Sequence, residues 1–318
     1  MNKPILFFLL FLFVHSAGCF AQAAMSPHWM YDNHYLTDKT VINPAFTGRQ
    51  YRTKIFASTQ RMAMGVREAP AVHLAGAHGR LNFGRERLNK LSAGYRDIRH
   101  AVGGLVFADI NGPFQTVGVK LDYAYIVPLN KQRSTLAFGL GGMIFSKRLN
   151  LDNAHALDPS DPLIAACTGN QTMAPDVNAG VLFSHDRLYV GLSVSQLLEN
   201  SFHLSSLNYN PPQVYRNFYL AAGYRLVYSR FELEPSIAAG HNLDTRTAGN
   251  NGKYVDVNFE FYLKPAVFTL SYRVDGYLTS SFQYRLEHLE LGIRIDLFST
   301  SSSDARLSGI GVMAAYTF

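Results

Sequence analysis

Residues 116–127 read TVGVKLDYAYIV, in which an apolar or aromatic residue occupies every second position. The positions between them hold mostly small or polar residues, among them Lys120 and Asp122. Successive side chains of a β-strand point to opposite faces of its sheet, so a period of two predicts a strand with one apolar face. The same alternation recurs at 253–263 and 289–298, and it decides the fold class.

Segments with this pattern follow one another along the chain after residue 50, and fourteen of them are predicted as strands. They lie at 52–59, 71–78, 100–109, 116–127, 134–147, 176–184, 188–194, 217–228, 231–241, 253–263, 266–274, 279–286, 289–298 and 310–318. Their number is even, as in single-chain outer-membrane barrels of bacteria. The connections alternate between short and long, as periplasmic turns and outer loops do in such barrels.

The last predicted strand ends in aromatic side chains. Tyr316 and Phe318 lie on its apolar face, and Phe318 is the final residue. Many outer-membrane barrels present such an ending to their insertion machinery, so we predict that these two residues form a membrane-insertion signal. Other Tyr and Phe residues near strand ends suit the membrane interfaces, where an apolar ring and a polar tip meet a wet boundary.

A sheet survives within a bilayer only when it closes on itself, because lipid cannot hydrogen-bond an unpaired N–H or C=O group. We therefore predict that residues 51–318 form an all-β, transmembrane antiparallel β-barrel of about fourteen strands. A soluble β-sandwich would show the same alternation and is the alternative fold. The even strand number, the loop lengths and the aromatic ending favour the barrel.

The overall composition excludes several other classes of protein. The chain has 318 residues, of which 47% are hydrophobic and 16% charged, and Tyr and Phe are abundant. Beyond the first twenty residues, no stretch approaches the roughly 18 consecutive apolar residues of a membrane-spanning helix. So many aromatic residues are untypical of disordered chains. The formal net charge is +6 without a basic stripe, which excludes a nucleic-acid partner.

The first 21 residues have the pattern of a secretory signal peptide. Lys3 supplies the positive charge, residues 5–14 are apolar, and cleavage is predicted before Gln22. An alternative is a lipoprotein signal with lipid on Cys19, for which Ser16 is a poor fit at the first position. In either case Cys167 is the one thiol left for pairing, so neither an intrachain disulfide nor a zinc cluster is expected.

Two further segments are candidate partner-binding sites. Residues 22–50 are not strand-like; they contain Trp29 and end in a turn signal at 43–48, where Asn-Pro starts the turn and glycine permits a positive φ. The second is the connection between the strands at 71–78 and 100–109, which is long although it lies on the predicted periplasmic side. Its basic residues include Arg85, Arg87 and Lys90. It is either a solvated extension of two strands or a basic docking surface.

No catalytic, cofactor or metal signature accompanies these segments. The histidines stand singly, and no nucleophile motif surrounds a serine. Gly139, Gly141 and Gly142 lie within a strand pattern, so we expect them to relieve crowding inside the barrel or to allow bending. Charged residues opposite the apolar faces are predicted to face the lumen: Lys120, Asp122, Asp256, Glu260, Arg273, Arg285, Glu290, Arg294 and Asp296. They either form internal salt bridges or line an aqueous path; a filled lumen is favoured.

The order of several short blocks resembles the PorP/SprF family of type IX secretion system outer-membrane proteins of the Bacteroidetes. The N-terminal block is the signal ending at Gln22 together with the Asn-Pro-Ala-aromatic-x-Gly element, here Asn43, Pro44, Ala45, Phe46, Thr47 and Gly48. Further blocks lie at 69–78, 121–130, 136–140, 158–162, 189–193, 222–225 and 234–236. Two departures are Met62, where a tryptophan is usual, and the basic stretch after His78, which looks like an insertion.

This resemblance implies a FadL-like barrel in the outer membrane, with residues 22–50 packed in or under it. It implies a non-enzymatic role in type IX protein secretion and, in some species, gliding motility. The implied partners are outer-membrane lipid, periplasmic secretion proteins including an OmpA-like peptidoglycan-binding protein, and the C-terminal domains of secreted substrates. On this interpretation the partner-binding candidates are Trp29, Asn43, Pro44, Phe46, Gly48, Arg85, Arg87 and Lys90. The alternative function is a FadL-like transporter or channel for hydrophobic small molecules.

Overall fold

The computed structural model describes residues 34–50, 52–62, 64–65, 69–81, 100–129, 134–149, 171–201, 213–243, 253–274, 277–298 and 308–318. Within these residues, three short 3-10 turns precede a series of β-strands. The turns are η3 (His34–Leu36), η4 (Lys39–Val41) and η5 (Pro44–Phe46). In this part of the chain, no helix combines the length and the apolarity that a membrane crossing requires.

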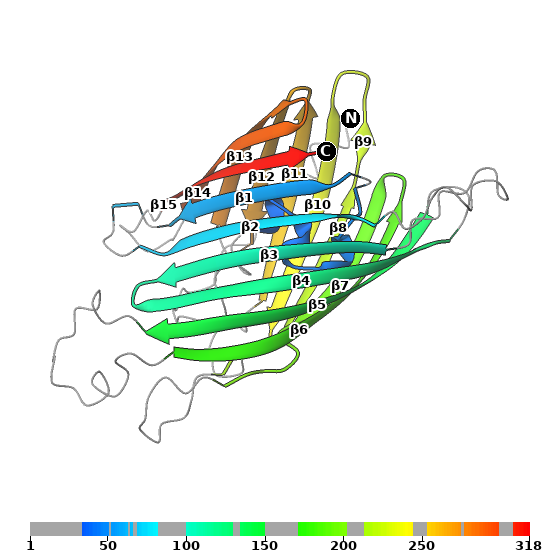
Figure 1. Cartoon of the computed structure of the whole chain (residues 1–318). Coiled ribbons are helices and arrows are strands. Elements are labelled where there is room, and N and C mark those ends of the chain that lie inside the picture. The colour runs from blue at the N-terminus through cyan, green and yellow to red at the C-terminus, as the bar shows by residue number, and fades with distance from the viewer. Residues whose placement is uncertain are drawn as a thin grey trace.

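The strands form one antiparallel sheet that winds around an axis (Figure 1). They are β1 (Lys54–Arg61), β2 (Ala71–Arg80), β3 (His100–Asn111), β4 (Phe114–Pro128), β5 (Ser134–Leu149), β6 (Gln171–His185), β7 (Leu188–Ser195), β8 (Asn217–Tyr224), β9 (Leu226–Val227), β10 (Glu232–Asn242), β11 (Lys253–Leu263), β12 (Ala266–Arg273), β13 (Tyr277–Leu286), β14 (Leu289–Phe298) and β15 (Ser308–Thr317). Consecutive strands pair with each other, except that β8 and β9 both pair with β10.

Pairing between the first and last strands closes the barrel. Lys54 of β1 lies opposite Thr317 of β15, and the register continues to Arg61 opposite Ile310. The two-residue strand β9 follows β8 after Arg225 and pairs with the same neighbour, β10. The two therefore act as one interrupted strand, and the wall has the fourteen strands that the sequence predicts. The prediction of a closed transmembrane barrel is confirmed, and the sandwich alternative is wrong because no free sheet edge remains among the described strands.

The two faces of the wall differ in chemistry as the alternation predicts. Leu121 and Leu192 point outward and are 67% and 59% exposed, whereas the adjacent Asp122 faces inward and is 6% exposed. Large apolar side chains that remain uncovered over the outer face of the described strands would be unfavourable in water, and they suit a lipid environment. Exposed aromatic residues lie around the rim at which β1 begins and β15 ends; they include Tyr224, Tyr228, Tyr284, Tyr316 and Phe318.

The barrel has two rims, which differ in the connections that they carry. The terminal end is the rim where β1 begins and β15 ends, and the loop end is the opposite rim. The chain turns tightly at 186–187, 264–265 and 287–288 on the terminal end. The predicted alternation of connection lengths is not strict, because β3 and β4 are joined at the loop end by only Gly112 and Pro113.

Strand β6 is the largest departure from the predicted boundaries. It begins at Gln171, which pairs with Arg148 of β5, whereas the prediction began at residue 176. Pro175 and Asp176 are poor strand residues and interrupt the sequence pattern. The pairing with β5 nevertheless continues past them, because the neighbouring residues keep the register.

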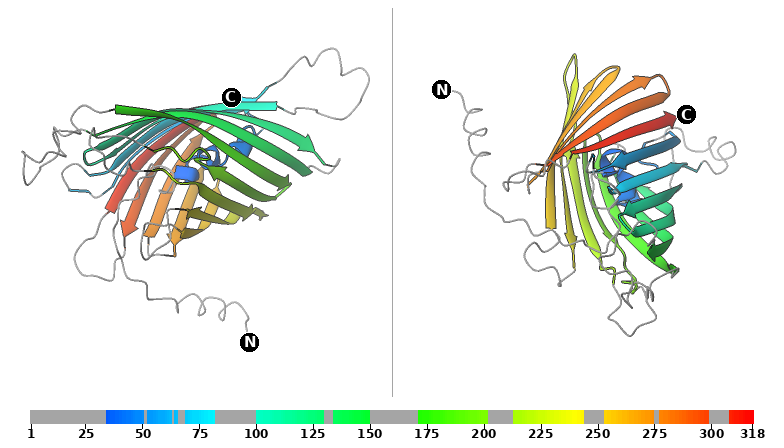
Figure 2. Two further views of the ribbon diagram at one scale, coloured as in Figure 1. Left: turned by 90° about the horizontal axis from the view of Figure 1, so that it is seen from below. Right: turned by 90° about the vertical axis from the view of Figure 1, so that its left-hand side faces the viewer.

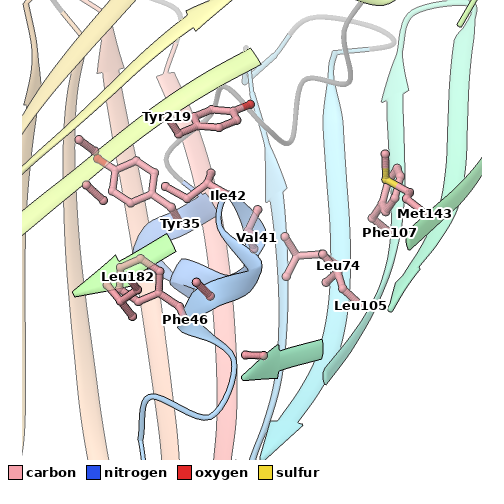
Figure 3. Close-up of a cluster of buried hydrophobic side chains, with 14 of the residues drawn as sticks. Tyr35, Val41, Ile42, Phe46, Leu74, Leu105, Phe107, Met143, Leu182 and Tyr219 are labelled. Atoms are coloured by element: carbon pink, nitrogen blue, oxygen red, sulfur yellow. The ribbon is translucent and has the colours of Figure 1, made fainter. Parts of the chain in front are cut away.

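The three 3-10 turns lie inside the ring of strands, as both views in Figure 2 show. Tyr35, Val41 and Phe46 of this segment are at most 4% exposed and join the main buried apolar cluster. Leu74, Leu105 and other inward-facing side chains of the wall complete the cluster (Figure 3). The barrel core is therefore built from this segment and the strands together.

Candidate functional site

The turn η5 and its flanking residues pack against the inner face of the wall. Asn43 caps the turn: its Oδ1 accepts a hydrogen bond from the Ala45 N–H at 2.8 Å. Its Nδ2 donates to the backbone carbonyls of Val181 and Leu192, at 3.4 and 3.2 Å. One buried amide thus fixes the local turn and joins it to β6 and β7.

Glycines of the wall make room for this turn. A Cβ added at Gly180 would overlap Asn43 Oδ1, and one added at Gly139 would overlap the backbone of Pro44 and Ala45. A Cβ at Gly191 would meet Asn43 and Phe46 at 3.0 Å. The expectation that glycines relieve crowding inside the barrel is confirmed for Gly139. Gly142 is different, because it faces outward with nothing within 4 Å of an added Cβ.

Phe46 and Arg49 pack around one tyrosine of β7. The Phe46 ring meets Tyr189 edge-on, with 5.6 Å between centroids, and the Arg49 guanidinium lies 4.3 Å from the Tyr189 centroid. Gly48, between them, has φ +68°, where a side chain would be strained. Its carbonyl accepts a hydrogen bond from Arg80 Nε at 2.6 Å. The turn predicted at 43–48 therefore forms, and it is anchored at both ends.

Asp38 is the centre of a second group of contacts. Its carboxylate lies 2.9 Å from Lys54 Nζ and 3.1 Å from His78 Nε2, and it accepts hydrogen bonds from the N–H and hydroxyl of Thr40. Burial alone would raise the pKa of Asp38, but Lys54, His78 and the hydrogen bonds outweigh it and hold the pKa well below its usual value. The ionised carboxylate thus joins the segment to β1 and β2.

Lys39 and Tyr35 connect the same segment to the opposite side of the barrel wall. Lys39 Nζ lies 3.3 Å from Glu260 and 3.8 Å from Glu234, so these carboxylates raise the pKa of Lys39 despite its burial. The Tyr35 hydroxyl donates to Asp256 at 3.1 Å. Strands β10 and β11, which supply these acidic groups, lie far from β1 around the barrel. The segment therefore spans the lumen.

Most of the charges that the sequence predicts to face the lumen contact an opposite charge or a polar group of the protein. Arg273 pairs with Asp256 at 2.7 Å, Lys120 with Asp122 at 3.2 Å, and Arg285 with Glu290 at 3.1 Å. Arg294 instead donates to Gln60 and to Thr37 of the segment. Asp296 accepts a hydrogen bond from Thr279. Most of these ionic groups are consequently satisfied within the protein.

A hollow of about 840 Å³ opens at the terminal end, and we call it the terminal-end basin. Residues 45–50 of the segment contribute to its floor, and the terminal ends of β2, β4, β5, β6 and β10 contribute to its walls. Its charged lining residues are Arg49, Arg80, Asp186, Arg187, Arg225 and Glu234. Sequence reasoning missed this basin, since its arginines come from segments that show no common motif.

The structure brings together only some of the predicted partner-binding residues. Asn43, Pro44, Phe46 and Gly48 are buried against the wall, so their side chains hold the segment. Their contact with a partner stays a prediction. Trp29, Arg85, Arg87 and Lys90 lie outside the described residues.

The predicted insertion residues lie together on the outside of the barrel. Tyr316 and Phe318 are 41% and 62% exposed, and their rings meet edge-on with centroids 4.9 Å apart. Their role in insertion is not tested by this arrangement. Among the described residues, no cluster of three or more His, Cys, Asp or Glu side chains could hold a metal ion.

Solved structures with a similar fold are outer-membrane barrels. The Pseudomonas putida toluene transporter TodX is 8% identical, with a TM-score of 0.50 over 90% of this chain and 93% of its own. The monoaromatic hydrocarbon channel CymD is 12% identical, with a TM-score of 0.49 over 94% of each chain. The Acinetobacter baumannii outer membrane protein Omp33 is 8% identical, with a TM-score of 0.47 over 85% of this chain and 100% of its own. At such identities the likeness concerns the fold alone, and it is that of FadL-like barrels.

A comparison with curated proteins finds no match. A family model does match: that of the type IX secretion system membrane protein PorP/SprF, over residues 26–309. This range includes the turn at 43–48 and all but the end of the barrel. Barrel and family together support an outer-membrane location and a part in type IX secretion. The chain belongs to the PorP/SprF family of type IX secretion system membrane proteins.

Proposed function

We propose that this protein is a non-enzymatic, partner-binding component of the type IX secretion apparatus. The observation that carries the proposal is the family match over residues 26–309. In the proposal, residues 22–50 act as a plug that closes the lumen, and the terminal end faces the periplasm. Periplasmic secretion proteins, including an OmpA-like peptidoglycan-binding protein, bind at that end. The C-terminal domains of exported proteins bind to loops 148–175 and 195–216 at the loop end.

The contacts of the segment support its role as a plug. It reaches β1 and β2 through Asp38, β6 and β7 through Asn43, and β10 and β11 through Lys39. Anchoring on three sides of a closed wall supports a segment that stays across the lumen. A plugged barrel would act through its rims and loops, which is what partner binding requires.

The alternative function, transport of hydrophobic small molecules, needs an apolar pocket inside the barrel and a gap in its wall. Along the described strands, each strand except the two-residue β9 is hydrogen-bonded to a neighbour on both sides. A strongly apolar hollow of about 720 Å³ lies over outward-facing side chains such as Ile293 and Val312. This hollow belongs to the lipid-facing surface. These observations favour secretion over transport.

Deletion of the gene in the source bacterium separates the two functions. We expect loss of secretion or surface attachment of type IX substrates, measured by immunoblots of the cell-surface and culture fractions. Re-expression of the intact gene is the control and should restore the secretion and the surface attachment of these substrates. If the substrates are secreted and attached normally while uptake of a hydrophobic compound falls, the proposal is wrong.

Shortening the connection within 148–175 tests the part assigned to the loop end. Barrel insertion should be unaffected, because the paired strands remain, and substrate retention at the surface should fall. Insertion is measured by the heat-dependent migration of the barrel in gels, and retention by surface labelling. Unchanged retention would exclude this loop from substrate binding.

A further inference from the structure

The terminal-end basin has the size and position of a binding site. Its volume of about 840 Å³ falls within the roughly 300–1,000 Å³ typical of ligand sites. It lies inside the closed wall, against the inner faces of β2, β4, β5, β6 and β10, and the paired strands separate it there from the outer face. A ligand would therefore enter from the terminal end rather than through the wall.

The basin carries an excess of positive charge that its own carboxylates do not neutralise. Of its two carboxylates, Glu234 is engaged by Arg225 at 2.7 Å and by Lys39 at 3.8 Å. For Arg49 and Arg187, in contrast, the described residues place no carboxylate within ion-pair distance of the guanidinium group. Within the described part of the chain, two guanidinium groups thus border the hollow outside any ion pair. Arg49 adds a longer-range attraction to Glu234, which Arg225 and Lys39 already contact.

Arg49 is held in place for an anion. Its guanidinium carbon lies over the Tyr189 ring at 4.3 Å from the centroid and over the Phe46 ring at 5.7 Å. Arg49 also lines the basin, so the same guanidinium borders both the aromatic rings and the hollow. A guanidinium that is already ordered loses less conformational freedom on binding, and its donors match the two oxygens of a carboxylate.

The rest of the lining favours a peptide over a small ion. Apolar side chains of Ile126, Leu182 and Leu188 border the same hollow as the arginines. Alternating acidic and apolar side chains would satisfy both kinds of lining, whereas a free anion would leave the apolar part uncovered. Gln50, which is exposed, offers an amide to a peptide backbone.

We propose that the terminal-end basin binds an acidic peptide segment of a periplasmic partner, with Arg49 and Arg187 as its carboxylate-binding residues. This inference rests on the proposed function, because it takes the terminal end to face the periplasm and a secretion partner. It adds the chemistry of the partner: carboxylates spaced along an extended segment that also carries apolar side chains.

Binding is tested with the full mature barrel purified in mild detergent. The probe is a fluorescein-labelled peptide of sequence Glu-Leu-Glu-Leu-Glu, and the matched peptide carries Gln in place of each Glu. Fluorescence anisotropy should show binding of the acidic peptide alone, weakening as salt rises because the contacts are ionic. Equal binding of both peptides, or binding of neither, would overturn the proposal.

Matched variants locate the site. Arg49→Gln and Arg187→Gln should each weaken binding by about tenfold or more, the loss expected for a hydrogen bond to a charged group. Arg230→Gln is the control, since Arg230 is exposed at the same rim but does not line the basin. Equal loss with Arg230→Gln would show non-specific attraction and refute the assignment. Circular dichroism and heat-dependent gel migration verify that each variant is folded.

Competition with lipid distinguishes a peptide site from a headgroup site. Vesicles of anionic phospholipid should fail to displace the peptide; displacement would mean that the arginines bind lipid headgroups and would overturn the peptide assignment. The binding experiment does not depend on secretion. If peptide binding fails while gene deletion abolishes type IX secretion, this inference alone is wrong. If binding succeeds while deletion leaves secretion intact, the proposed function is wrong.

Discussion

Replacing Asp38 by asparagine should release the luminal segment from the wall. Asp38 is the carboxylate between Lys54 and His78, and its side chain and that of Lys54 are 7% and 11% exposed. Asparagine preserves the size of the side chain and its bonds to Thr40, but it leaves the Lys54 ammonium buried beside a neutral group. Removing one partner of a buried ion pair costs about 3–5 kcal/mol.

The fraction of molecules in which the segment has left the wall can be calculated from this loss of free energy. A loss of about 3–5 kcal/mol raises the fraction of open segment roughly a hundredfold to a few thousandfold, if the barrel itself stays closed. The wall should stay closed because its strands pair through backbone hydrogen bonds that Asp38 does not make. The substitution therefore separates the segment from the barrel.

Thiol accessibility measures the opening. Val41 is 2% exposed within the segment, so Val41→Cys in a Cys167→Ser background should react slowly with a maleimide. Adding Asp38→Asn should raise the rate of this reaction roughly a hundredfold to a few thousandfold. Asp186→Asn, an exposed carboxylate at the terminal end, is the control and should leave the rate unchanged.

A double variant tests the reasoning about charge. Lys54→Met removes the ammonium that Asp38→Asn leaves unpaired, so the combination should recover much of the lost protection. If Asp38→Asn does not change the rate of Val41→Cys in a folded barrel, the Asp38 cluster does not hold the segment. If the double variant is as open as the single one, the cost is not that of a buried unpaired charge.

Three other outcomes are expected. The pKa of Asp38 is depressed in the folded protein, so its ionised form stabilises the fold fully above the ordinary carboxyl pKa, and this contribution is lost as the pH falls through the lower folded value. Between pH 7 and 3, the unfolding temperature, followed by gel migration, should therefore fall less for Asp38→Asn than for the unchanged protein. Gly180→Ala should lower the free energy of unfolding by about 1–3 kcal/mol, because the added Cβ overlaps Asn43. Gly142→Ala should lower it little, because the added Cβ meets nothing within 4 Å. Equal effects of the two variants in denaturant titrations would contradict the packing argument. Phe318→Ala should slow membrane insertion, measured as the fraction of heat-modifiable barrel in outer-membrane preparations, and an unchanged fraction would exclude the aromatic ending as a signal.

The wall of the barrel could be predicted because each strand faces lipid on one side. That requirement imposes a period of two on every strand separately, so 116–127 and 289–298 each carry the signal without reference to the rest of the chain. The pattern was weakest where a residue such as Pro175 interrupted it, and there the boundary of β6 was misplaced. The connection of β3 to β4 also departed from the expected length rule.

The luminal site could not be predicted in the same way. Its turns have three residues each, which is too short for any periodic pattern. Its contacts join residues far apart in sequence, such as Tyr35 and Asp256, 221 positions apart. Gly139 showed from the sequence that something needs space inside the barrel, but a glycine cannot indicate which backbone lies against it. Arg49 and Arg187 lack a shared motif, so the basin emerges only from the fold.

Two kinds of contact hold the luminal segment, and they differ in what can disrupt them. The Asn43 turn fits against Gly139 and Gly180 by shape, so its contact depends on close packing and is insensitive to charge. The contacts of Asp38 and Lys39 depend on ionised partners in the wall. A change in charge at the terminal end, such as an acidic segment that competes for Lys39, would weaken the second group and leave the first intact. Opening would then begin near Asp38 and Lys39, while the Asn43 turn keeps the segment attached to β6 and β7.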